Sequence, residues 1–540
     1  MDALALGLDF GTESARAVLL DARDGSELAS AVHAYEHGVL VDALPTGEAL
    51  PGRFALQHPA DWVAAMVATT RAVLSQAQAE PRRVAGVGVA FTACTILPVQ
   101  ADGTPLCMVR ELARRPHAWP KLWKHHAAQP QADAINALAR SAGQTWLDCY
   151  GGQLSPEWLL PKVLEVLEHA PEIYGAAAYF VEAADWIVWQ LTGRLARNAC
   201  AAGFKATWHG TAGYPAASFL AALRPELADY FATRGAGPVV PPGTPVGTVR
   251  PHWTARLGLC PETHVAAGII DAHAGAIGAG ATDPGTLYLA MGTSTCHLLN
   301  APGEQLVPGI SGVVKDGIVA GAYAYEAGQA AVGDLFAWQV RQSGHSHEEL
   351  TARAAVPRAG ETGLLAIDWF NGSRTPHADA DLTGAILGMT LTTTPADVYR
   401  ALIEATAYGT RAIVDALEDA DVHVGRYVAG GGLTVSRLVM SIYANVLGQP
   451  LETCESRHPS ARGAAVLGAV AAGRHASVGA AAAAMAPARR RIAPDRGEAG
   501  VYDRLYGAYR DLADCLAKDQ ASPLRRLGAV RVGAAAPQRC

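Results

Sequence analysis

Two distant segments of the 540-residue chain repeat one local pattern, and this repeat limits the choice of fold more than any other feature. The first, LALGLDFGTESARAVLL, begins at Leu4, and the second, GTLYLAMGTSTCHLLN, begins at Gly285. Each consists of an apolar run, a turn of small residues that starts with glycine, and a second apolar run. Such a pattern is typical of a β-hairpin. We therefore expect a duplicated unit built around antiparallel strands.

Further elements are expected around these hairpins. A third strand follows the Asp24-Gly25 turn, and segments with helical spacing of Ala and Leu cover residues 59–78, 155–169 and 395–417. Residues 479–486 have good helix propensity, and residues 235–243, rich in Gly and Pro, predict a surface loop. Sheets covered by helices follow from this order, so the predicted fold class is α/β.

A chain of this length is too long for one hydrophobic core. The sequence Thr282-Asp283-Pro284-Gly285 interrupts the pattern just before the second hairpin, so we place a domain boundary at Pro284. The predicted domains are residues 1–283 and 284–515, followed by a basic tail, 516–540, for which we expect disorder. Ligands are then expected in the cleft between the domains.

Composition excludes several functional classes. A net charge of −7 and a pI near 6.2 give no broad attraction to nucleic acid or to an anionic membrane. The nine cysteines are scattered and form no CxxC pair, which argues against disulfides and zinc and favours a reducing cytoplasm. Neither a secretion signal nor a run long enough for a membrane helix is recognised. The expected partners are small molecules.

The first glycine turn carries groups suited to phosphate binding. Asp9 ends the apolar run, and Gly11-Thr12 follows it. Bound phosphate needs exposed backbone N–H groups, hydroxyl donors and a carboxylate for the accompanying magnesium ion. An ordinary hairpin turn, in which the aspartate bonds its own backbone, is an equally good interpretation of this turn alone.

Two more glycine turns strengthen the phosphate interpretation. Gly292-Thr293 occupies the same place in the second hairpin, so the two turns could hold a phosphate chain from both sides. Gly431-Gly432 follows a third apolar run and precedes a helix expected near Val435. Glycines there let a nucleotide base or ribose approach the backbone, although a structural turn explains them equally well.

Asp271 is the candidate general base. It ends the apolar run 265–270 and precedes a helix of small residues. The alternative role is that of an N-cap, which is a common use of aspartate at such a junction. In phosphoryl transfer a carboxylate orients and deprotonates the attacking hydroxyl, and Asp271 suits that task. His273 has no Ser or Cys partner and is expected to be a packing residue.

Taken in this order, the features resemble the FGGY carbohydrate kinases, which belong to the sugar kinase, chaperone and actin superfamily. The resemblance extends from Leu4 to Tyr509 and is strongest in these stretches: GLDFGTESARAVLLD, KLWKHHAAQ, EAADWIVWQLTG, GFKATWH, AMGTSTCH, YEAGQAAVGDLFAWQ, DWFNGSRTP and EATAYGTRAIVDA. It implies two duplicated actin-like (ribonuclease H-like) domains that close over ATP, Mg²⁺ and a ketopentose. Within the family the chain looks most like the members that convert L-ribulose to L-ribulose 5-phosphate.

The resemblance also assigns roles to individual residues. It makes Asp271 the catalytic base, Asp9 the magnesium residue, and the Gly11-Thr12 and Gly292-Thr293 turns the phosphate elements. It implies sugar contacts from Thr95, Trp123, Lys205 and Glu326, with Asp271 also at the sugar. Charged hydrogen-bond partners and an aromatic face suit a polyhydroxylated substrate. The residues alone favour structural roles instead: Thr95 as a strand residue, Trp123 as a half-buried core aromatic, Lys205 as a solvated strand charge and Glu326 as a surface carboxylate.

Two positions depart from the pattern of the family. Ala90 stands in Gly88-Val89-Ala90 where ribulose-specific members usually have aspartate, and Arg437 stands where the family commonly has asparagine. Ala90 keeps open a kinase for another ketose or polyol, such as xylulose or ribitol. A non-catalytic, ATP-switched binding module is the alternative from a different class, and a homodimer stays open.

Overall fold

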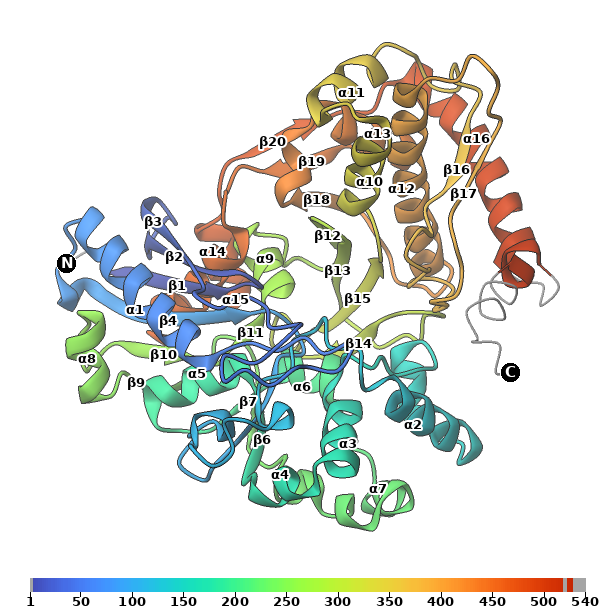
Figure 1. Cartoon of the computed structure of the whole chain (residues 1–540). Coiled ribbons are helices and arrows are strands. Elements are labelled where there is room, and N and C mark those ends of the chain that lie inside the picture. The colour runs from blue at the N-terminus through green and yellow to red at the C-terminus, as the bar shows by residue number, and fades with distance from the viewer. Residues whose placement is uncertain (1–2, 518–521, 528–540) are drawn as a thin grey trace.

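The computed structural model describes residues 3–517 and 522–527. It has two lobes, each built on a seven-stranded sheet (Figure 1). The first sheet contains β1 (Leu4–Phe10), β2 (Ser14–Asp21), β3 (Glu27–Ala34), β4 (Val84–Phe91), β9 (Pro245–Thr248), β10 (His264–Ala266) and β11 (Ile269–Ile270). The second contains β12 (Thr286–Met291), β13 (Thr295–Ala301), β14 (Gly312–Lys315), β15 (Tyr323–Gln329), β18 (Arg426–Gly430), β19 (Leu451–Cys454) and β20 (Arg489–Ile492).

The duplication expected from the two hairpins is confirmed. The strand order β3-β2-β1-β4 of the first sheet corresponds to β15-β13-β12-β18 in the second. In both copies the hairpin is antiparallel, and its first strand also pairs in parallel with β4 or β18. The turns match as well: Gly11 N donates to Ser14 O at 2.9 Å, and Gly292 N donates to Ser294 O at 2.9 Å. The predicted α/β class and the third strand, β3, are also confirmed.

Helices cover the sheets as expected. The first lobe has α1 (Pro59–Gln76), α2 (Gln129–Ser141), α3 (Leu159–His169), α4 (Pro171–Ala176), α5 (Ala183–Thr192), α6 (Ala199–Ala206), α7 (Ala217–Leu223), α8 (Pro251–Leu257) and α9 (Asp271–Gly278). The second has α10 (Gly333–Ser343), α11 (His347–Ala354), α12 (Pro395–Glu418), α13 (Arg437–Leu447) and α16 (Arg496–Ala517). Two further helices, α14 (Pro459–Ala471) and α15 (Val478–Ala484), follow β19 in the chain.

Small two-stranded sheets complete the lobes. They pair β5 (Ile96–Val99) with β6 (Tyr179–Glu182), β7 (Arg197–Asn198) with β8 (Val239–Val240), and β16 (Leu365–Ile367) with β17 (Ala385–Leu387). Because β8 falls within residues 235–243, the expected surface loop contains a short strand.

The predicted helices form with small shifts at their ends. The helix expected over residues 155–169 begins four residues late, at Leu159, after the irregular segment that contains Pro156. The helix expected over 395–417 begins at Pro395, where Thr394 and Asp397 form a capping box. Of the predicted tail, residues 518–521 and 528–540 lie outside the described part of the chain.

Helix α14 joins the two lobes. It follows a strand of the second sheet, yet it packs on β1 and β4 of the first sheet and on α9 (Figure 1). The packing is backbone against backbone: a Cβ atom added at Gly7 would lie 1.8 Å from Ala461 O, and one at Gly88 would lie 1.8 Å from Ala464 O. Glycines in β1 and β4 are therefore required for α14 to approach the sheet this closely.

Within residues 3–517 and 522–527, no helix is long and apolar enough to cross a membrane.

Replacing Gly7 by alanine tests the contact between α14 and β1. Because the new Cβ would meet the backbone oxygen of Ala461 rather than a movable side chain, we expect Gly7→Ala to lower the free energy of unfolding by about 3 kcal/mol or more. Gly507→Ala, at an exposed position of α16 with nothing within 4 Å, is the control and is expected to add up to about 1 kcal/mol. Denaturant unfolding of both variants measures the difference, and equal stabilities would contradict the proposed packing constraint.

Candidate active site

Asp9 and Asp271 converge at the carboxyl ends of three parallel strands. Asp9 in β1 pairs with Ala90 in β4, and Ala90 pairs with Ile269 in β11. Asp271 follows β11 as the first residue of α9, and its Oδ1 accepts a hydrogen bond from Ala272 N at 2.7 Å. The N-cap position itself belongs to Ile270, so the N-cap alternative for Asp271 is wrong.

The environment of Asp271 favours proton transfer near neutral pH. Burial, followed by the negative charge of Asp9, raises the pKa of Asp271 to about 7. A carboxylate with such a pKa accepts a proton far more readily than an exposed aspartate does. The charge of Asp9 thus affects the protonation of Asp271. Such coupling is expected where a cation-binding carboxylate and a general base share one site.

Asp9 is almost fully buried, at 6% exposed. Its Oδ2 lies 3.3 Å from Arg16 Nη1, and its Oδ1 has no hydrogen-bond partner among the described residues. Burial raises the pKa of Asp9 although Arg16 acts to lower it. Sequence reasoning did not single out Arg16, but the hairpin register pairs it directly with Asp9, so the turn position alone could have found it.

The two phosphate turns present different surfaces. Gly292 and Thr293 are exposed, and their carbonyls accept hydrogen bonds from the backbone of residues 332–334 at the start of α10. In the first turn, Gly11 is buried beside the Arg16 guanidinium. Thr12 Oγ1 accepts a hydrogen bond from Trp123 Nε1 at 3.2 Å, so this predicted sugar residue lies directly beside the first turn.

Lys205 and Glu326 form an ion pair between the lobes. Lys205 Nζ, from α6, donates to the two Glu326 carboxylate oxygens, in β15, at 2.7 and 2.8 Å. Burial alone would lower the pKa of Lys205, but the carboxylate of Glu326 outweighs it and raises the pKa. The interpretations as a solvated strand charge and a surface carboxylate are therefore wrong, because Lys205 is in a helix and both side chains are largely buried.

His273 lies beside this ion pair. Its Nε2 is 3.4 Å from Glu326 Oε2, and its ring centroid is 4.5 Å from that of Phe204. Burial lowers the pKa of His273 to about 4, so the ring is neutral at pH 7. This placement agrees with the expectation that His273 is a packed or supporting residue rather than a nucleophile.

Thr95 is placed differently from the other sugar candidates. It is fully buried between β4 and β5, and its hydroxyl is 3.1 Å from that of Thr92. Burial leaves its side chain no exposed surface in this conformation. Trp123, by contrast, is half-buried, as one of the interpretations from sequence expected.

The third glycine cluster adjoins the second phosphate turn. Gly431 follows β18 with φ of +102°, and a Cβ atom there would lie 2.4 Å from Met291 O, at the end of β12. The helix expected near Val435 is α13, which begins at Arg437 after the N-cap Ser436. Arg437 is exposed.

Arg374 is a second residue that sequence reasoning missed. It lies in the loop after β16, and its Nη2 is 4.0 Å from Glu157 Oε1 in the first lobe. Burial acts to lower the pKa of Arg374, but the carboxylates of Glu157 and Glu326 outweigh it and raise the pKa. A single arginine in an irregular loop gives no pattern from which this placement could be predicted.

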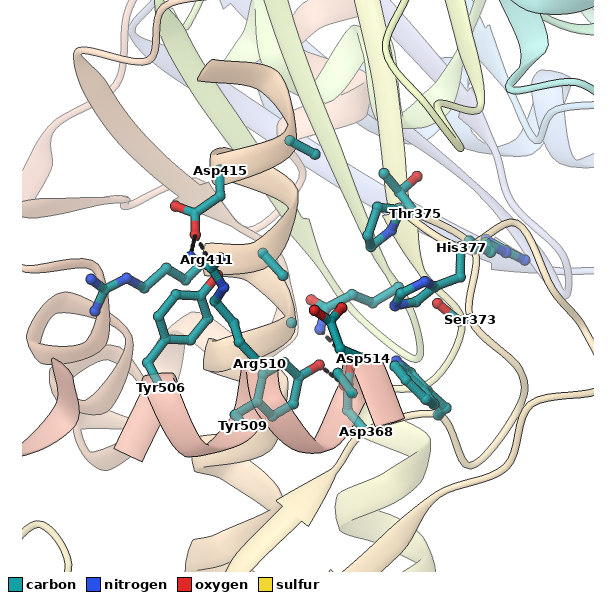
Figure 2. Close-up of a pocket in the computed structure, with 18 of the residues that line it drawn as sticks. Asp368, Ser373, Thr375, His377, Arg411, Asp415, Tyr506, Tyr509, Arg510 and Asp514 are labelled. Carbon is teal, nitrogen blue, oxygen red and sulfur yellow. Dashed lines mark hydrogen bonds and ion pairs between the residues drawn. The ribbon is translucent and has the colours of Figure 1, made fainter. Parts of the chain in front are cut away.

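A cavity of about 900 Å³ lies nearby, between α12, α16 and the loop that contains Arg374 (Figure 2). Its polar side chains bond largely to one another: Tyr509 OH donates to Asp368 at 2.8 Å, and Tyr506 OH donates to Asp415 at 2.5 Å. The cavity is not lined by Asp9, Asp271 or either phosphate turn. It is therefore a weaker candidate for the reaction centre than the region around Asp9, Asp271 and the phosphate turns.

Known proteins match this chain over almost its whole length. A ribulokinase from Geobacillus thermodenitrificans is 45% identical over 97% of this chain and 96% of its own. One from Mycolicibacterium smegmatis is 44% identical over 98% of this chain and 96% of its own. Among solved structures, a xylulose kinase from Rhodospirillum rubrum has a TM-score of 0.79 at 25% identity, covering 95% of this chain and 99% of its own.

Family models match both lobes. The N-terminal domain of the FGGY family of carbohydrate kinases matches residues 4–278, and its C-terminal domain matches residues 287–472. Together with the two actin-like lobes and the paired glycine turns, these matches cover the elements that carry the candidate site. The chain belongs to the FGGY family of carbohydrate kinases.

Proposed function

We propose that this chain transfers the γ-phosphoryl group of ATP to the terminal hydroxyl of L-ribulose, giving L-ribulose 5-phosphate and ADP. The observation that carries the proposal is the partly buried carboxylate of Asp271 beside Asp9 at the carboxyl ends of the parallel strands, with its pKa raised to about 7 by desolvation and by the charge of Asp9. The substrate is suggested by the relatives named ribulokinase, which are 42–45% identical to this chain.

Asp271 acts as the base in this reaction. It accepts the proton of the sugar hydroxyl while the hydroxyl oxygen forms its bond to the γ-phosphorus and the bond from that phosphorus to the ADP oxygen breaks. Because the pKa of Asp271 is near 7, the group is largely ionised under mildly alkaline conditions and can take up the proton.

The sugar is proposed to bind among Trp123, Lys205 and Glu326, with Thr95 shaping the pocket from beneath. The Lys205–Glu326 pair supplies charged donors and acceptors, and Trp123 supplies an apolar face for the C–H side of the sugar. The hydrogen bond from Trp123 to Thr12 connects this sugar side to the first phosphate turn.

Nucleotide binding is assigned to the glycine turns. Gly11-Thr12 and Gly292-Thr293 are proposed to contact the phosphates, and Gly431-Gly432 the adenosine. Arg16 and Arg374 are additional candidates for stabilising the negative charge of the transferring group. Arg437, the first residue of α13, is proposed to adjoin the adenosine.

Asp9 fits a magnesium ion. Its buried Oδ1 has no hydrogen-bond partner among the described residues, and a carboxylate oxygen is a preferred magnesium ligand. When bound, magnesium neutralises phosphate charge. Arg16 holds the other oxygen of Asp9, and without the ion, burial and the charge of Asp9 raise the pKa of Asp271; a cation at Asp9 would lower that pKa.

We also propose that the division near Pro284 separates the two functional domains, and that the enzyme acts in the cytoplasm on small molecules. Residues 1–283 then carry the sugar side and the first phosphate turn, while residues 284–515 carry the second turn and the adenosine side. Helix α14 is the exception, because it lies in the second segment but packs on the first sheet.

A kinase for another ketose or polyol is the second candidate, and Ala90 favours it. Ala90 is fully buried between Asp9 and Ile269, so the carboxylate that ribulose-specific members are expected to carry there is replaced by a methyl group. The solved relative from Rhodospirillum rubrum is a xylulose kinase, which makes xylulose the first alternative to test.

Asp271→Asn tests the proposed base. The amide has the same shape but cannot take up the proton, so we expect sugar-dependent turnover to fall by about 10² to 10⁴-fold while ATP binding survives. In the unaltered enzyme, kcat/KM for the sugar should rise with pH up to about 7 and then level off. A coupled ADP-release assay with L-ribulose, xylulose and ribitol gives both results.

A control and a stability measurement complete this test. Asp397→Asn changes an aspartate in the first turn of α12, outside the cleft, and should keep full turnover. Because folding raises the pKa of Asp271 from 3.8 to about 7, the folded state loses stability as pH rises between these values. Asp271→Asn should remove this loss. ATP hydrolysis that no tested sugar stimulates would contradict the kinase and favour an ATP-switched binding module.

Ala90→Asp tests the choice of substrate. If position 90 shapes the sugar pocket, a carboxylate there should raise kcat/KM for L-ribulose relative to xylulose and ribitol. Ala90→Asn is the matched control, because it has nearly the same volume without the charge. An unchanged order of preference in Ala90→Asp, with the variant folded, would show that this position does not determine the substrate.

A further inference from the structure

Helix α3 directs two charged side chains into the interior of the first lobe. Lys162 and Glu165 lie at i and i+3, hence on one face of the helix, and the exposed His169 continues this face at the end of the helix. Lys162 and Glu165 are each only 1% exposed. Charged side chains are rarely buried without a specific partner, so the groups that stabilise each of these two charges have to be identified.

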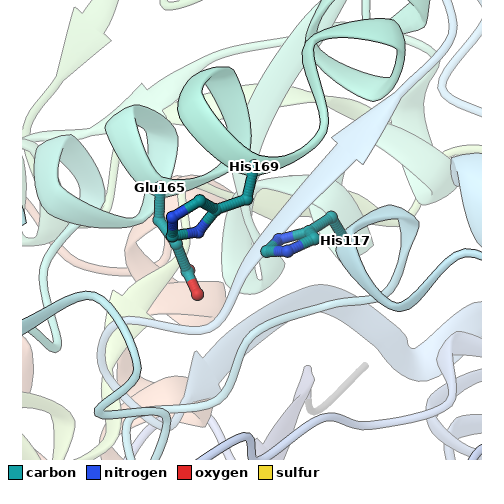
Figure 3. Close-up of side chains that lie close together, drawn as sticks. All are labelled: His117, Glu165 and His169. Atoms are coloured by element: carbon teal, nitrogen blue, oxygen red, sulfur yellow. The ribbon is translucent and has the colours of Figure 1, made fainter. Parts of the chain in front are cut away.

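Glu165 has its partners close by. Lys121 Nζ lies 3.1 Å from Glu165 Oε2, and His125 Nε2 lies 2.9 Å from the same oxygen. Figure 3 shows Glu165 with His117 and His169, a set of side chains that could in principle hold a metal ion. The ammonium of Lys121 also lies 3.0 Å from His117 Nδ1. The positive charge of Lys121 therefore already occupies the place beside Glu165 and His117 that a metal ion would take.

Lys162 is bound differently. Its ammonium donates to three backbone carbonyls: Cys94 O at 2.6 Å, Leu122 O at 2.9 Å and Lys121 O at 3.3 Å. These bonds use all three hydrogens of the ammonium. Within the described part of the chain, no carboxylate lies within ion-pair distance of Lys162. Burial lowers its pKa to about 8, which measures how unfavourable the position is for a charge.

The three carbonyls belong to the two segments that carry predicted sugar contacts. Cys94 directly precedes Thr95, and Leu122 directly precedes Trp123. The segments are also bonded to each other, with Ile96 N donating to Lys121 O at 3.1 Å and Lys121 N to Ile96 O at 2.8 Å. Cys94 has φ of +61°, an uncommon conformation for a residue with a side chain, and persists only when its surroundings fix it.

The start of α3 also adjoins residues of the candidate site. Trp158, its N-cap residue, has its ring centroid 5.5 Å from Lys205 Nζ, and Glu157 faces Arg374 at 4.0 Å. A displacement of α3 would therefore alter the pocket at both ends, through Lys162 and through Trp158.

We propose that Lys162 is a positioning residue for sugar binding, whose ammonium fixes the backbone of the segments that carry Thr95 and Trp123. Lys162 is too buried to touch a ligand, so it acts through these two residues. The inference rests on the proposed function, because it takes Thr95 and Trp123 as parts of the sugar pocket.

Lys162→Met tests this role, since it keeps the length of the side chain and removes the three donors. We expect kcat/KM for the sugar to fall by about 10- to 100-fold through KM, because small displacements of binding groups have effects of this size. KM for ATP should change less than about two-fold, since the three carbonyls lie on the sugar side.

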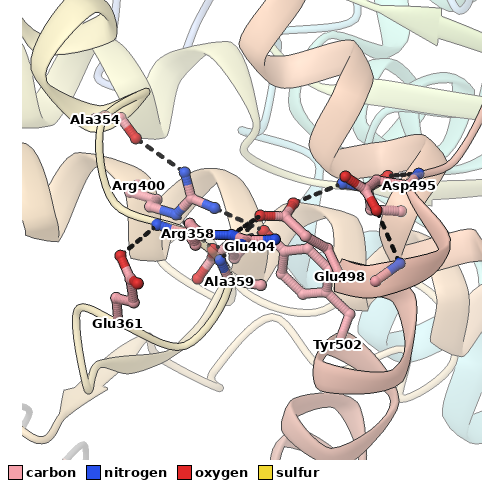
Figure 4. A network of polar contacts seen from close by, with 11 residues as sticks. Ala354, Arg358, Ala359, Glu361, Arg400, Glu404, Asp495, Glu498 and Tyr502 are labelled. Carbon is pink, nitrogen blue, oxygen red and sulfur yellow. Dashed lines mark hydrogen bonds and ion pairs between the residues drawn. The ribbon is translucent and has the colours of Figure 1, made fainter.

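Arg400→Met is the matched control. Arg400 is also buried, and it donates to Ala354 O at 2.9 Å, Glu404 Oε1 at 2.9 Å and Tyr502 OH at 3.0 Å (Figure 4). This network lies in the second lobe, away from the sugar residues. Arg400→Met should lower the thermal stability without selectively raising KM for the sugar. The proposal would be overturned if Lys162→Met and Arg400→Met had the same KM for the sugar. It would also be overturned if Lys162→Met raised KM for the sugar and KM for ATP to the same extent.

Amide hydrogen exchange supplies a readout that does not depend on turnover. In Lys162→Met the amides of Ile96, Lys121 and Leu122 should exchange faster than in the unaltered protein, whereas in Arg400→Met they should not. Lys162→Gln, which keeps two donors on a shorter side chain, provides a second variant if Lys162→Met does not fold. Unaltered enzyme without sugar turnover would refute the proposed function, while unchanged exchange in these amides would refute the role of Lys162.

Discussion

The contact between α14 and the first sheet is the constraint on which the rest of the structure depends. Its backbone reaches β1 and β4 only because Gly7 and Gly88 present no side chain, and the same helix packs on α9 through Gly463. These three elements end at, or begin with, the residues of the candidate site. Asp9 lies two residues beyond Gly7, and Asp271 opens α9. The relative position of the Asp9 and Asp271 carboxylates thus depends on the packing of α14, which belongs to the second half of the chain.

Charge is distributed unequally across the cleft. Around Asp9 and Asp271, burial holds the pKa of both carboxylates above its ordinary value, and the charge of Asp9 adds to the shift of Asp271. Around Lys205 and Glu326, close pairing outweighs burial and keeps both groups ionised. The Asp9–Asp271 pair can consequently accept a proton or a cation, and the Lys205–Glu326 pair can exchange hydrogen bonds with hydroxyl groups. This division suits a reaction in which a sugar hydroxyl, held by one pair, reacts with a phosphate chain beside the other pair.

Local patterns in the sequence were sufficient for the hairpins, the glycine turns and the duplicated fold. They work because a strand, a tight turn and a strand are specified by neighbouring residues. The burial of Lys205, the placement of Arg374 and the hydrogen bonds of Lys162 depend on segments far apart in the chain, so no local pattern indicates them. The packing of α14 on the first sheet was missed for the same reason. Thr95 and Trp123 came from family resemblance, and their roles at the sugar remain predictions.

The ion pair between Lys205 and Glu326 has a consequence for selectivity. Since its two partners come from different lobes, a ligand entering between them must offer each charge a hydrogen-bonding group as good as the one it displaces. A compound without a hydroxyl group for one of the two charges would leave that charge desolvated and without a hydrogen-bond partner. Discrimination at this point of the cleft should follow the hydroxyl pattern of a ligand more strictly than its size.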